Sequence, residues 1–355
     1  MSREKKYEID MCNGSIMDKL ISFALPLMLS GMLQLMFNAV DIVVVGRFSG
    51  SQSLAAVGAT TALIYLFTNL FIGISLGANV LAARYYAAGK HEEMSETVHT
   101  AMMFALISGI IMIFVGLFFS RLALEIMGTP SDVIEQATLY MRIYFLGMPF
   151  FMLYNYGAAI LRAVGDTKRP LIFLIISGVV NACLNMLLVI VFHLDVAGVA
   201  IATVTSQFIS CVLVIGCLYR TKSSYQLRFS HLKIRKEYLK PICQVGIPAG
   251  IQSTVINFSN ALLQSSVNSF GSTTMAGYTA ANNIFGFLYV SVNAITQACM
   301  SFTSQNYGLR KLKRMDKILI DCLILTVVVS LVLGGGVYLF GAEILRLYTE
   351  EAEVI

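Results

Sequence analysis

The sequence contains few charged residues. Asp, Glu, Lys and Arg make up 13% of its 355 residues, against about 25% in an average soluble domain. It also lacks long runs rich in proline, glycine or serine and blocks of like charge, which excludes a collagen-like or mostly disordered chain. Hydrophobic residues account for 57% of the chain and form stretches longer than the roughly 9–11 residues of a membrane β-strand. We therefore predict an all-α integral membrane protein.

Motifs that would indicate an enzyme are also absent. HExxH, paired CxxC, GxGxxG and GxxxxGKS do not occur, so nothing predicts a metalloprotease, a dinucleotide site or ATP hydrolysis on this chain. The four histidines never have the spacing of two metal ligands. Six of the seven cysteines fall in or beside apolar runs, as small core residues do. We expect no enzymatic activity and no cofactor, with an ion gradient or another chain as the energy source.

Nine apolar runs are long enough to cross a membrane as helices. They are 20–46, 54–83, 99–120, 139–161, 171–194, 196–218, 243–269, 273–304 and 318–341. The first is too long for a signal-peptide core and is not followed by a small-residue cleavage site, so we expect it to remain in the mature protein. The sequence thus predicts a polytopic helical bundle preceded by a tail, 1–19.

Basic residues favour one orientation of this bundle. With the N-terminus inside, the tail and the segments 84–98, 162–170, 219–242 and 305–317 hold most of the 25 Lys and Arg residues. Basic loops are retained on the cytoplasmic side, so we predict a cytoplasmic N-terminus. The net charge of +5 then reflects topology and not nucleic acid binding. The basic linker 219–242 either only fixes the topology or also binds anionic lipid.

Short motifs recur at a nearly constant spacing of 221 or 222 residues, which predicts an internal repeat. The matches are Ala24-Leu25-Pro26 with Gly246-Ile247-Pro248, Tyr85 with Tyr307, Gly50 and Leu54-Ala55 with Gly271 and Met275-Ala276, and Asp132-Val133-Ile134 with Glu353-Val354-Ile355. Six helices in the first copy would give both copies the same orientation, as in parallel-repeat transporters. We predict a six-helix N-lobe, 20–218, the linker 219–242, and three helices of an incomplete C-lobe, 243–355.

Asp41 is the carboxylate placed deepest in the first predicted lobe. It precedes Gly46 by five residues, so it lies roughly 8 Å inside the helix end. A charge at membrane depth costs about 2.5–3.5 kcal/mol on insertion scales and calls for a compensating role. Gln34 and Asn38 precede Asp41 by seven and three positions, which places all three side chains on one side of the helix.

Other helices carry matching polar groups. Asn181 pairs with Asn185 and Thr203 with Gln207, each at the i, i+4 spacing of one helix face, and Asn155 adds an amide. These groups either hydrogen-bond neighbouring helices and hold the bundle together or line a cavity. Such a cavity would suit a proton, a small cation or an amine, and some of the 18 methionines and 22 phenylalanines could accept apolar and cationic guests.

Several motifs resemble the multidrug and toxic compound extrusion (MATE) family. They are Leu25-Pro26-Leu27, Val40-Asp41, Gly46-Arg47, Leu161-Arg162, the loop Gly165-Asp166-Thr167-Lys168-Arg169-Pro170, Gly246-Ile247-Pro248 and Gln305-Asn306-Tyr307-Gly308. The resemblance covers nearly the whole chain. It implies twelve helices in two lobes of six, and drug efflux in exchange for protons or sodium ions. By the same resemblance the chain ends, at Ile355, before the expected last three helices.

The resemblance also assigns residues. Asp41 matches the helix-one aspartate of the family, and four residues match polar positions of the N-lobe cavity: Gln34, Asn155, Asn181 and Thr203. The family commonly shows Asn-x-x-x-Asp in its fifth helix, whereas here Asn181 is followed by Asn185. Asparagine can coordinate a cation through its carbonyl but cannot exchange a proton.

The resemblance is to the bacterial branch of the family, so we expect a monomeric, ion-coupled antiporter of a bacterial inner membrane that exports cationic or amphipathic organic compounds by alternating access. Membrane lipids would surround it. Proton or sodium coupling would involve Asp41, Asn181, Asn185 and Thr203, which all offer oxygen ligands for a possible sodium ion. The remaining polar residues, Gln34, Asn38, Asn155 and Gln207, would line the substrate cavity. The rival hypotheses are a lipid-linked oligosaccharide flippase, which would need several intramembrane cations, and a nontransporting receptor or regulatory subunit.

Overall fold

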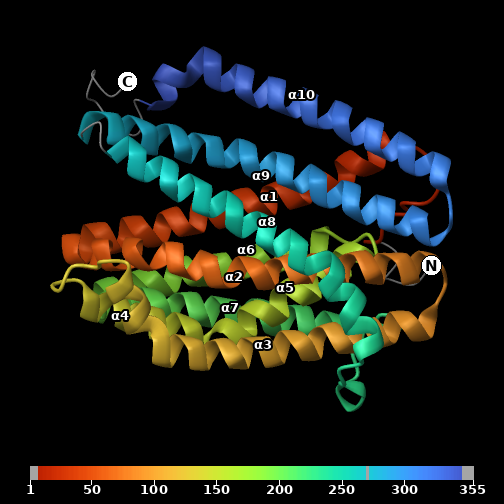
Figure 1. Ribbon diagram of the computed structural model, residues 1–355, viewed down its shortest axis with the longest axis horizontal. Coiled ribbons are helices and arrows are strands. Elements are labelled where there is room, and N and C mark those ends of the chain that lie inside the picture. Colours follow the sequence, from red (N-terminus) through yellow and green to blue (C-terminus); the bar gives the residue numbers. More distant parts are fainter. Residues whose placement is uncertain (1–6, 269–271, 346–355) are drawn as a thin grey trace.

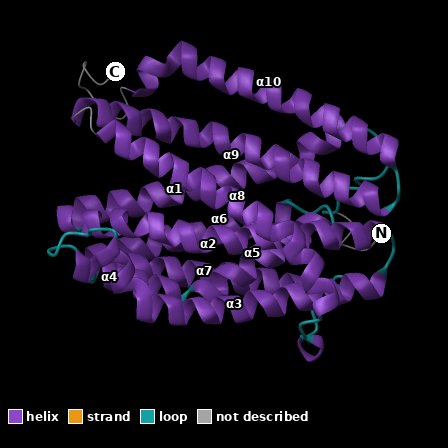
Figure 2. Ribbon diagram, viewed as in Figure 1, coloured by secondary structure: helices purple, strands orange, loops and turns teal. Residues whose placement is uncertain are grey.

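The computed structural model describes residues 7–268 and 272–345, and all the regular structure in them is helical (Figures 1 and 2). The helices are α1 (Met17–Phe48), α2 (Gly50–Ala87), α3 (His91–Ile126), α4 (Ile134–Leu146), α5 (Met148–Ala163), α6 (Lys168–Asn185), the π-helical turn η2 (Met186–Val191), α7 (Asp195–Arg220), the short η3 (Phe229–His231), α8 (Lys236–Asn268), α9 (Ser272–Gly308) and α10 (Leu312–Leu345). The prediction of an all-helical bundle is confirmed for this part of the chain.

The helical prediction is less accurate at two bends. The run 139–161 is not one helix, because α4 and α5 meet at Gly147 at an angle of 48°. Pro149 lies in the first turn of α5, where a missing N–H breaks no helical hydrogen bond. The run 171–194 also divides: α6 ends at Asn185, continues as the π-helical turn η2, and a turn with positive φ at His193 and Asp195 leads into α7.

Among the described residues, seven helices are individually long and apolar enough to span a membrane, and the bent pair α4 and α5 would make an eighth. The sequence-based count of nine spans is not reached, since α8 does not qualify although it is 33 residues long. Polar residues such as Gln252, Ser253 and Asn257 interrupt its apolar character. A membrane is nevertheless the environment that suits so many long apolar helices, so the chain is an integral membrane protein.

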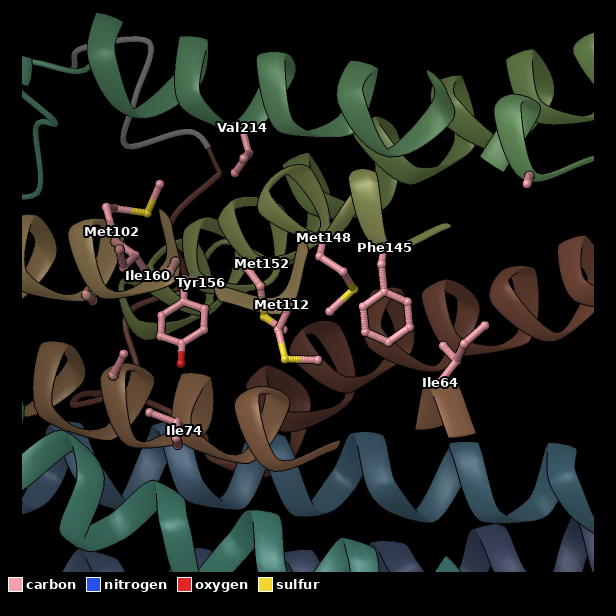
Figure 3. Packing of buried hydrophobic residues seen from close by; sticks show 14 of the residues in the cluster. Ile64, Ile74, Met102, Met112, Phe145, Met148, Met152, Tyr156, Ile160 and Val214 are labelled. Atoms are coloured by element: carbon pink, nitrogen blue, oxygen red, sulfur yellow. The ribbon is translucent and has the colours of Figure 1, made fainter. Parts of the chain in front are cut away.

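The first seven helices, α1–α7, share a large apolar core (Figure 3). Met148, Met152, Tyr156 and Ile160 follow one another along α5 and are fully buried. Side chains from α2, α3, α4 and α7 surround them, as Figure 3 shows with Ile64, Ile74, Met102, Met112, Phe145 and Val214. Because α5 is covered by these neighbours, it is the central helix of this group.

The last three helices, α8–α10, pack against the first seven through α1 and α2. Helix α9 lies along α1, and α8 lies along α2 (Figure 1). The second pair is so close that a Cβ atom added at Gly73 would lie 2.3 Å from Gly250 Cα, and one at Gly77 would lie 2.0 Å from Ile242 O. Small residues permit this approach between helices in a membrane.

Candidate ion-binding site

Two helices bring the predicted carboxylate and amides together. Asp41 is near the end of α1, and Asn181 and Asn185 form one face of α6, where both are buried. Asn185 Nδ2 donates a hydrogen bond to Asp41 Oδ1 and another, 3.2 Å long, to Asn181 Oδ1. Three predicted residues that lie up to 144 positions apart in the chain therefore share one network.

Asn185 uses both of its amide hydrogens in this network, because a primary amide has two donors. Its remaining atom, Oδ1, is buried and accepts no hydrogen bond from the part of the chain that the structure describes. The assignment of nitrogen and oxygen in this side chain follows from the network, since the carboxylate of Asp41 can only accept when ionised. The site thus presents a carboxylate beside an unpaired carbonyl oxygen.

Helix α7 contributes two further oxygens. Thr203 lies beside the Asp41 carboxyl group. Its Oγ1 is buried within reach of that carboxyl group, and Gln207 Oε1, one turn later, is buried near the hydroxyl of Tyr144. Asn185 Oδ1 therefore remains the oxygen of this group without a partner among the described residues, and such buried polar atoms are rare in native proteins.

The local fold explains why Asn185 reaches Asp41. Asn185 is the last α-helical residue of α6, and the π-helical turn η2 begins at the next position. Single π-helical turns are rare and frequently occur at functional sites. The change of helical pitch lets the chain turn back tightly through His193 and Asp195, so that α7 returns alongside α6 with Thr203 near the same carboxylate.

Three predicted cavity residues do not belong to this network. Gln34 is exposed and Asn38, also exposed, donates a 3.4 Å hydrogen bond to Tyr65 Oη of α2. Asn155 donates to Phe151 O within α5, at 2.8 Å. Their positions are compatible with an open surface or a helix contact, and the structure does not join them to Asp41.

Two tyrosines that sequence reasoning missed lie within electrostatic reach of Asp41. They are Tyr140 and Tyr144, on α4, with ring centroids 6.3 Å apart. The signal that could have found them is their i, i+4 spacing in an apolar helix, the same spacing that identified Asn181 and Asn185. Aromatic rings beside an anionic site can also face a cationic guest.

The chemistry available here is that of a small oxygen site. Carboxylate, carbonyl and hydroxyl oxygens suit hard cations, and the carboxyl group of Asp41 can alternatively hold a proton. The neutral amides and the hydroxyl can coordinate but cannot take up a proton at ordinary pH. Asp41 is therefore the one group of the network through which a proton and a metal cation could compete.

Comparison with known proteins identifies the family. A family model described as MatE matches residues 26–187 and 248–355. The chain belongs to the MatE family. The resemblance drawn from its motifs is thus confirmed, and α1, α2, α6, α8 and α9 all fall partly or wholly within the MatE matches.

Curated relatives of this MatE chain are named as multidrug resistance or multidrug export proteins. The probable multidrug resistance protein YoeA of Bacillus subtilis is 30% identical over 342 residues, which are 94% of this chain and 73% of YoeA. The probable multidrug resistance protein YpnP of the same organism is 28% identical, over 98% of this chain and 77% of its own length. The multidrug export protein MepA of Staphylococcus aureus is 21% identical, over 100% of this chain and 78% of MepA.

Solved structures confirm the MATE fold. An outward-facing multidrug resistance MATE family transporter of the MOP superfamily superposes with a TM-score of 0.91, at 22% identity, over 97% of this chain and 77% of its own. A MOP superfamily transporter from Pyrococcus furiosus superposes with a TM-score of 0.89, also at 22% identity, over 97% of this chain and 76% of its own.

Proposed function

We propose that this MatE protein exports cationic or amphipathic organic compounds in exchange for protons or sodium ions by alternating access. The observation that carries the proposal is the half-buried Asp41 carboxyl group beside the unpaired carbonyl oxygen of Asn185 and the hydroxyl of Thr203. These oxygens would act as ligands if a cation occupies the site during part of a transport cycle. The names of YoeA and MepA, a probable multidrug resistance protein and a multidrug export protein, support export of varied compounds.

Competition for one group would couple the two movements. Burial in an apolar medium favours a protonated carboxyl group in general, and a neighbouring cation favours a carboxylate. A proton, a sodium ion and a cationic substrate would then exclude one another at Asp41. In the sodium version the ion is held by oxygens of Asp41, Asn181, Asn185 and Thr203, whose chemistry suits it, while Gln34, Asn38, Asn155 and Gln207 face substrate.

A two-lobe arrangement fits the packing. We infer a six-span lobe, 20–218, and three helices of a second lobe, 243–355, joined by the linker 219–242. The two MatE matches begin at Pro26 and Pro248, with the same offset of 222 residues as the sequence repeat. Helix α1 packs on α9 and α2 on α8, the crossed pairing expected when two copies are related by a twofold axis. The repeat matches at Gly271 and at Glu353, Val354 and Ile355 lie outside the described residues.

Side-chain hydrogen bonds between the described parts of the two lobes gather at one end of the molecule. Every side-chain hydrogen bond recorded between the described parts of α1–α7 and α8–α10 lies at the end where α1 begins, for example from Gln305 Nε2 to Ala163 O at 2.7 Å and from Ser301 Oγ to Asn79 Oδ1 at 3.1 Å. Toward the opposite end most described side chains of 251–268 are exposed. The structure is closed at the end where α1 begins, here called the tail end. Exchange between this closed state and a state that is open at the tail end is the simplest route for alternating access.

We place the tail end in the cytoplasm of a bacterium, because the basic segments gather there. The transporter would act as a monomer among the lipids of the cytoplasmic membrane. The flippase hypothesis is not retained, since the family and the named relatives favour drug export and the sequence offers few intramembrane cations for a pyrophosphate group.

Transport by purified protein in lipid vesicles tests this function. Vesicles loaded with a fluorescent organic cation receive either a pH step or a sodium step, each without the other. We expect efflux of the dye under at least one gradient and none when both gradients are collapsed. Efflux that ignores both gradients, or no efflux of several chemically different cations, would reject the proposed antiport.

A further inference from the structure

The N-terminal tail, defined here as residues 7–16, crosses the end of the bundle where α1 begins (Figure 1). It contains almost no regular structure, yet it is not loose. Met11 is fully buried, and Cys12 and Ile16 are nearly so. The partners of the tail lie on both groups of helices, α1–α7 and α8–α10, and their chemistry suggests a role beyond topology.

Glu8 fixes the first part of the tail to the α1–α7 group. Its Oε2 accepts a hydrogen bond from Tyr86 Oη of α2 at 2.9 Å, and its Oε1 accepts one from Tyr225 Oη of the linker at 2.8 Å. Burial raises the pKa of Tyr225 to about 12, so this hydroxyl keeps its proton at physiological pH. One residue later, Ile9 N donates to Gly165 O at 3.2 Å.

The loop that receives Ile9 is built for close contact. Gly165 has φ of +95°, and a Cβ atom there would lie 2.5 Å from Ile9 O. The next residue, Asp166, has a fully buried side chain that pairs with Arg169 and accepts hydrogen bonds from the first N–H groups of α6. Arg169 also donates to Tyr225 Oη at 3.4 Å. The loop that receives Ile9 is therefore held in place by its own contacts.

The second part of the tail is fixed to the α8–α10 group and to the start of α1, where Lys19 Nζ donates to Asp10 O and Asn13 O, each at 2.7 Å. Asn306 Nδ2 of α9 donates to Met11 O at 3.1 Å, Lys311 Nζ donates to Cys12 O at 2.9 Å, and Arg314 of α10 donates to Gly14 O at 3.0 Å. Met11 itself packs in a small core with residues of α1 and α9. This anchor uses backbone carbonyl groups, so it depends on the path of the tail more than on its side chains.

The two anchors are separated by a single residue of the chain. Only Asp10 separates Ile9, held by one group of helices, from Met11, held by the other. Three extended residues span at most about 11 Å, so the groups cannot move apart by more than a few ångströms at this end while both anchors hold. The direct side-chain bonds between the groups, such as Gln305 with Ala163 O, are few.

We propose that residues 7–14 form a latch that keeps the tail end of the transporter closed, and that Glu8 is the point at which it releases. The proposal rests on alternating access as given above. Glu8 is the release point because its anchor consists of two hydroxyl bonds, one backbone bond and the contact of Arg169 with the Tyr7 ring at 5.7 Å, whereas the Met11 anchor combines a buried side chain with several bonds to backbone carbonyl groups. Opening of this end then requires the tail to leave Tyr86 and Tyr225 and to travel with α9, α10 and the start of α1, whose Leu20, Phe23 and Ala24 share one core with Met11 and α9.

Spin-label distances test the latch. Nitroxides are placed at Glu92 of α3 and Lys313 of α10, both exposed at this end, after the solvent-accessible native cysteines are replaced by alanine. The parent protein in nanodiscs is recorded with and without sodium, at acid and at neutral pH. We expect Glu8→Ala to raise the ratio of long to short distances about tenfold, which corresponds to the loss of hydrogen bonds to a charged group.

Two further variants keep the test independent of folding. Tyr225→Phe and Tyr86→Phe remove one hydroxyl each with little change in volume, and each should shift the ratio in the same direction by a smaller factor. Glu237→Ala is the matched control, since Glu237 is an exposed carboxylate at the same end with no recorded hydrogen bond or ion pair to a described residue; it should leave the ratio at the parent value.

The possible results separate the two proposals. Long distances that appear in the parent but do not increase in the Glu8 and tyrosine variants would overturn the latch and leave alternating access intact. A single short distance in the parent and in every variant, under all four conditions, would contradict alternating access itself and the latch with it.

Discussion

At the scale of single residues, Asn185 decides how the proposed site works. It donates to Asp41 and Asn181 and keeps an unpaired oxygen. A carboxylate at this position would supply a second negative charge, and two adjacent carboxylates resist ionising together unless a cation or a proton lies between them. With an amide at position 185, the ionised site carries a single negative charge, from Asp41. Its affinity for a metal cation is therefore lower than that of a site with two carboxylates.

Asn185→Asp is thus expected to strengthen sodium binding. We predict that the sodium Kd falls about tenfold, or 1.4 kcal/mol, measured as the rise of Tm of the purified protein with sodium concentration. Asn155→Asp is the matched control, because Asn155 bonds to its own helix and not to Asp41. An unchanged sodium response in Asn185→Asp would mean that no sodium ion binds beside Asp41.

Some of this site could be predicted from the sequence. A carboxylate in an apolar helix and two amides at i, i+4 are visible in one dimension, and the structure does bring Asp41, Asn181 and Asn185 together. The sequence does not show that Asn155 lies outside this network. An amide in a helix can donate to the carbonyl group of the preceding turn, as Asn155 does, and no pattern distinguishes this from a contact with another helix. The direction in which Gln34 and Asn38 face depends on packing between α1 and its neighbours, which no local pattern reveals.

At the scale of helices, the contact between α2 and α8 depends on glycine. Gly77 has no room for a side chain, since an added Cβ atom would lie 2.0 Å from Ile242 O and a backbone carbonyl cannot rotate away. We predict that Gly77→Ala destabilises the protein by about 1–3 kcal/mol, the usual cost of overpacking, measured by thermal unfolding in detergent.

The same substitution at Gly58 provides the control for this prediction. Gly58 lies in the same helix, and an added Cβ atom would meet nothing within 4 Å. Gly58→Ala should leave stability unchanged or raise it by up to about 1 kcal/mol through helix propensity. Equal stability of the two variants would show that α2 and α8 are not in close contact.

Helices were easier to predict than their interruptions. Long apolar runs predicted the positions of all the long described helices, because burial of backbone groups in a membrane leaves little alternative. Pro149 marks a possible kink in the run 139–161, but the sequence predicts neither the division of that run into two helices at Gly147 nor the π-helical turn after Asn185. Each depends on tertiary contacts, such as the close approach of Gln207 and Val204 to Gly147, which would leave no room for a side chain there.

At the scale of the whole molecule, the distribution of basic residues predicts which face meets the cytoplasm. Single cysteines at Lys233 in the linker and at Thr129 between α3 and α4, in a cysteine-free background, can be labelled from either side with a charged maleimide. We predict that in intact cells Thr129→Cys reacts and Lys233→Cys does not. The reverse pattern would place the tail and its latch outside the cell.

The overall fold was predictable through the family motifs, while the path of the tail was not. The loop Gly165-Asp166-Thr167-Lys168-Arg169-Pro170 could be recognised as a motif, but its contact with Ile9 joins two segments that share no periodic pattern. The tail has no hydrophobic repeat and therefore no helical signal. Only the three-dimensional structure shows that its carbonyl groups meet Asn306, Lys311 and Arg314.

The central claim is that Asp41 couples ion movement to export, and one substitution tests it most directly. Asp41→Asn keeps the size of the side chain but cannot titrate or carry charge. Asp321→Asn makes the same change at the other carboxylate within a predicted span, in α10. Both variants are compared with the parent in dye-loaded vesicles under a pH step and under a sodium step.

We predict that Asp41→Asn inserts normally and loses gradient-driven export by at least about a hundredfold, the effect of removing about 2.7 kcal/mol of coupling, while Asp321→Asn transports at the parent rate. If Asp41→Asn exports at the parent rate under both gradients, the aspartate is a structural contact between α1 and α6 and the proposed coupling mechanism is wrong.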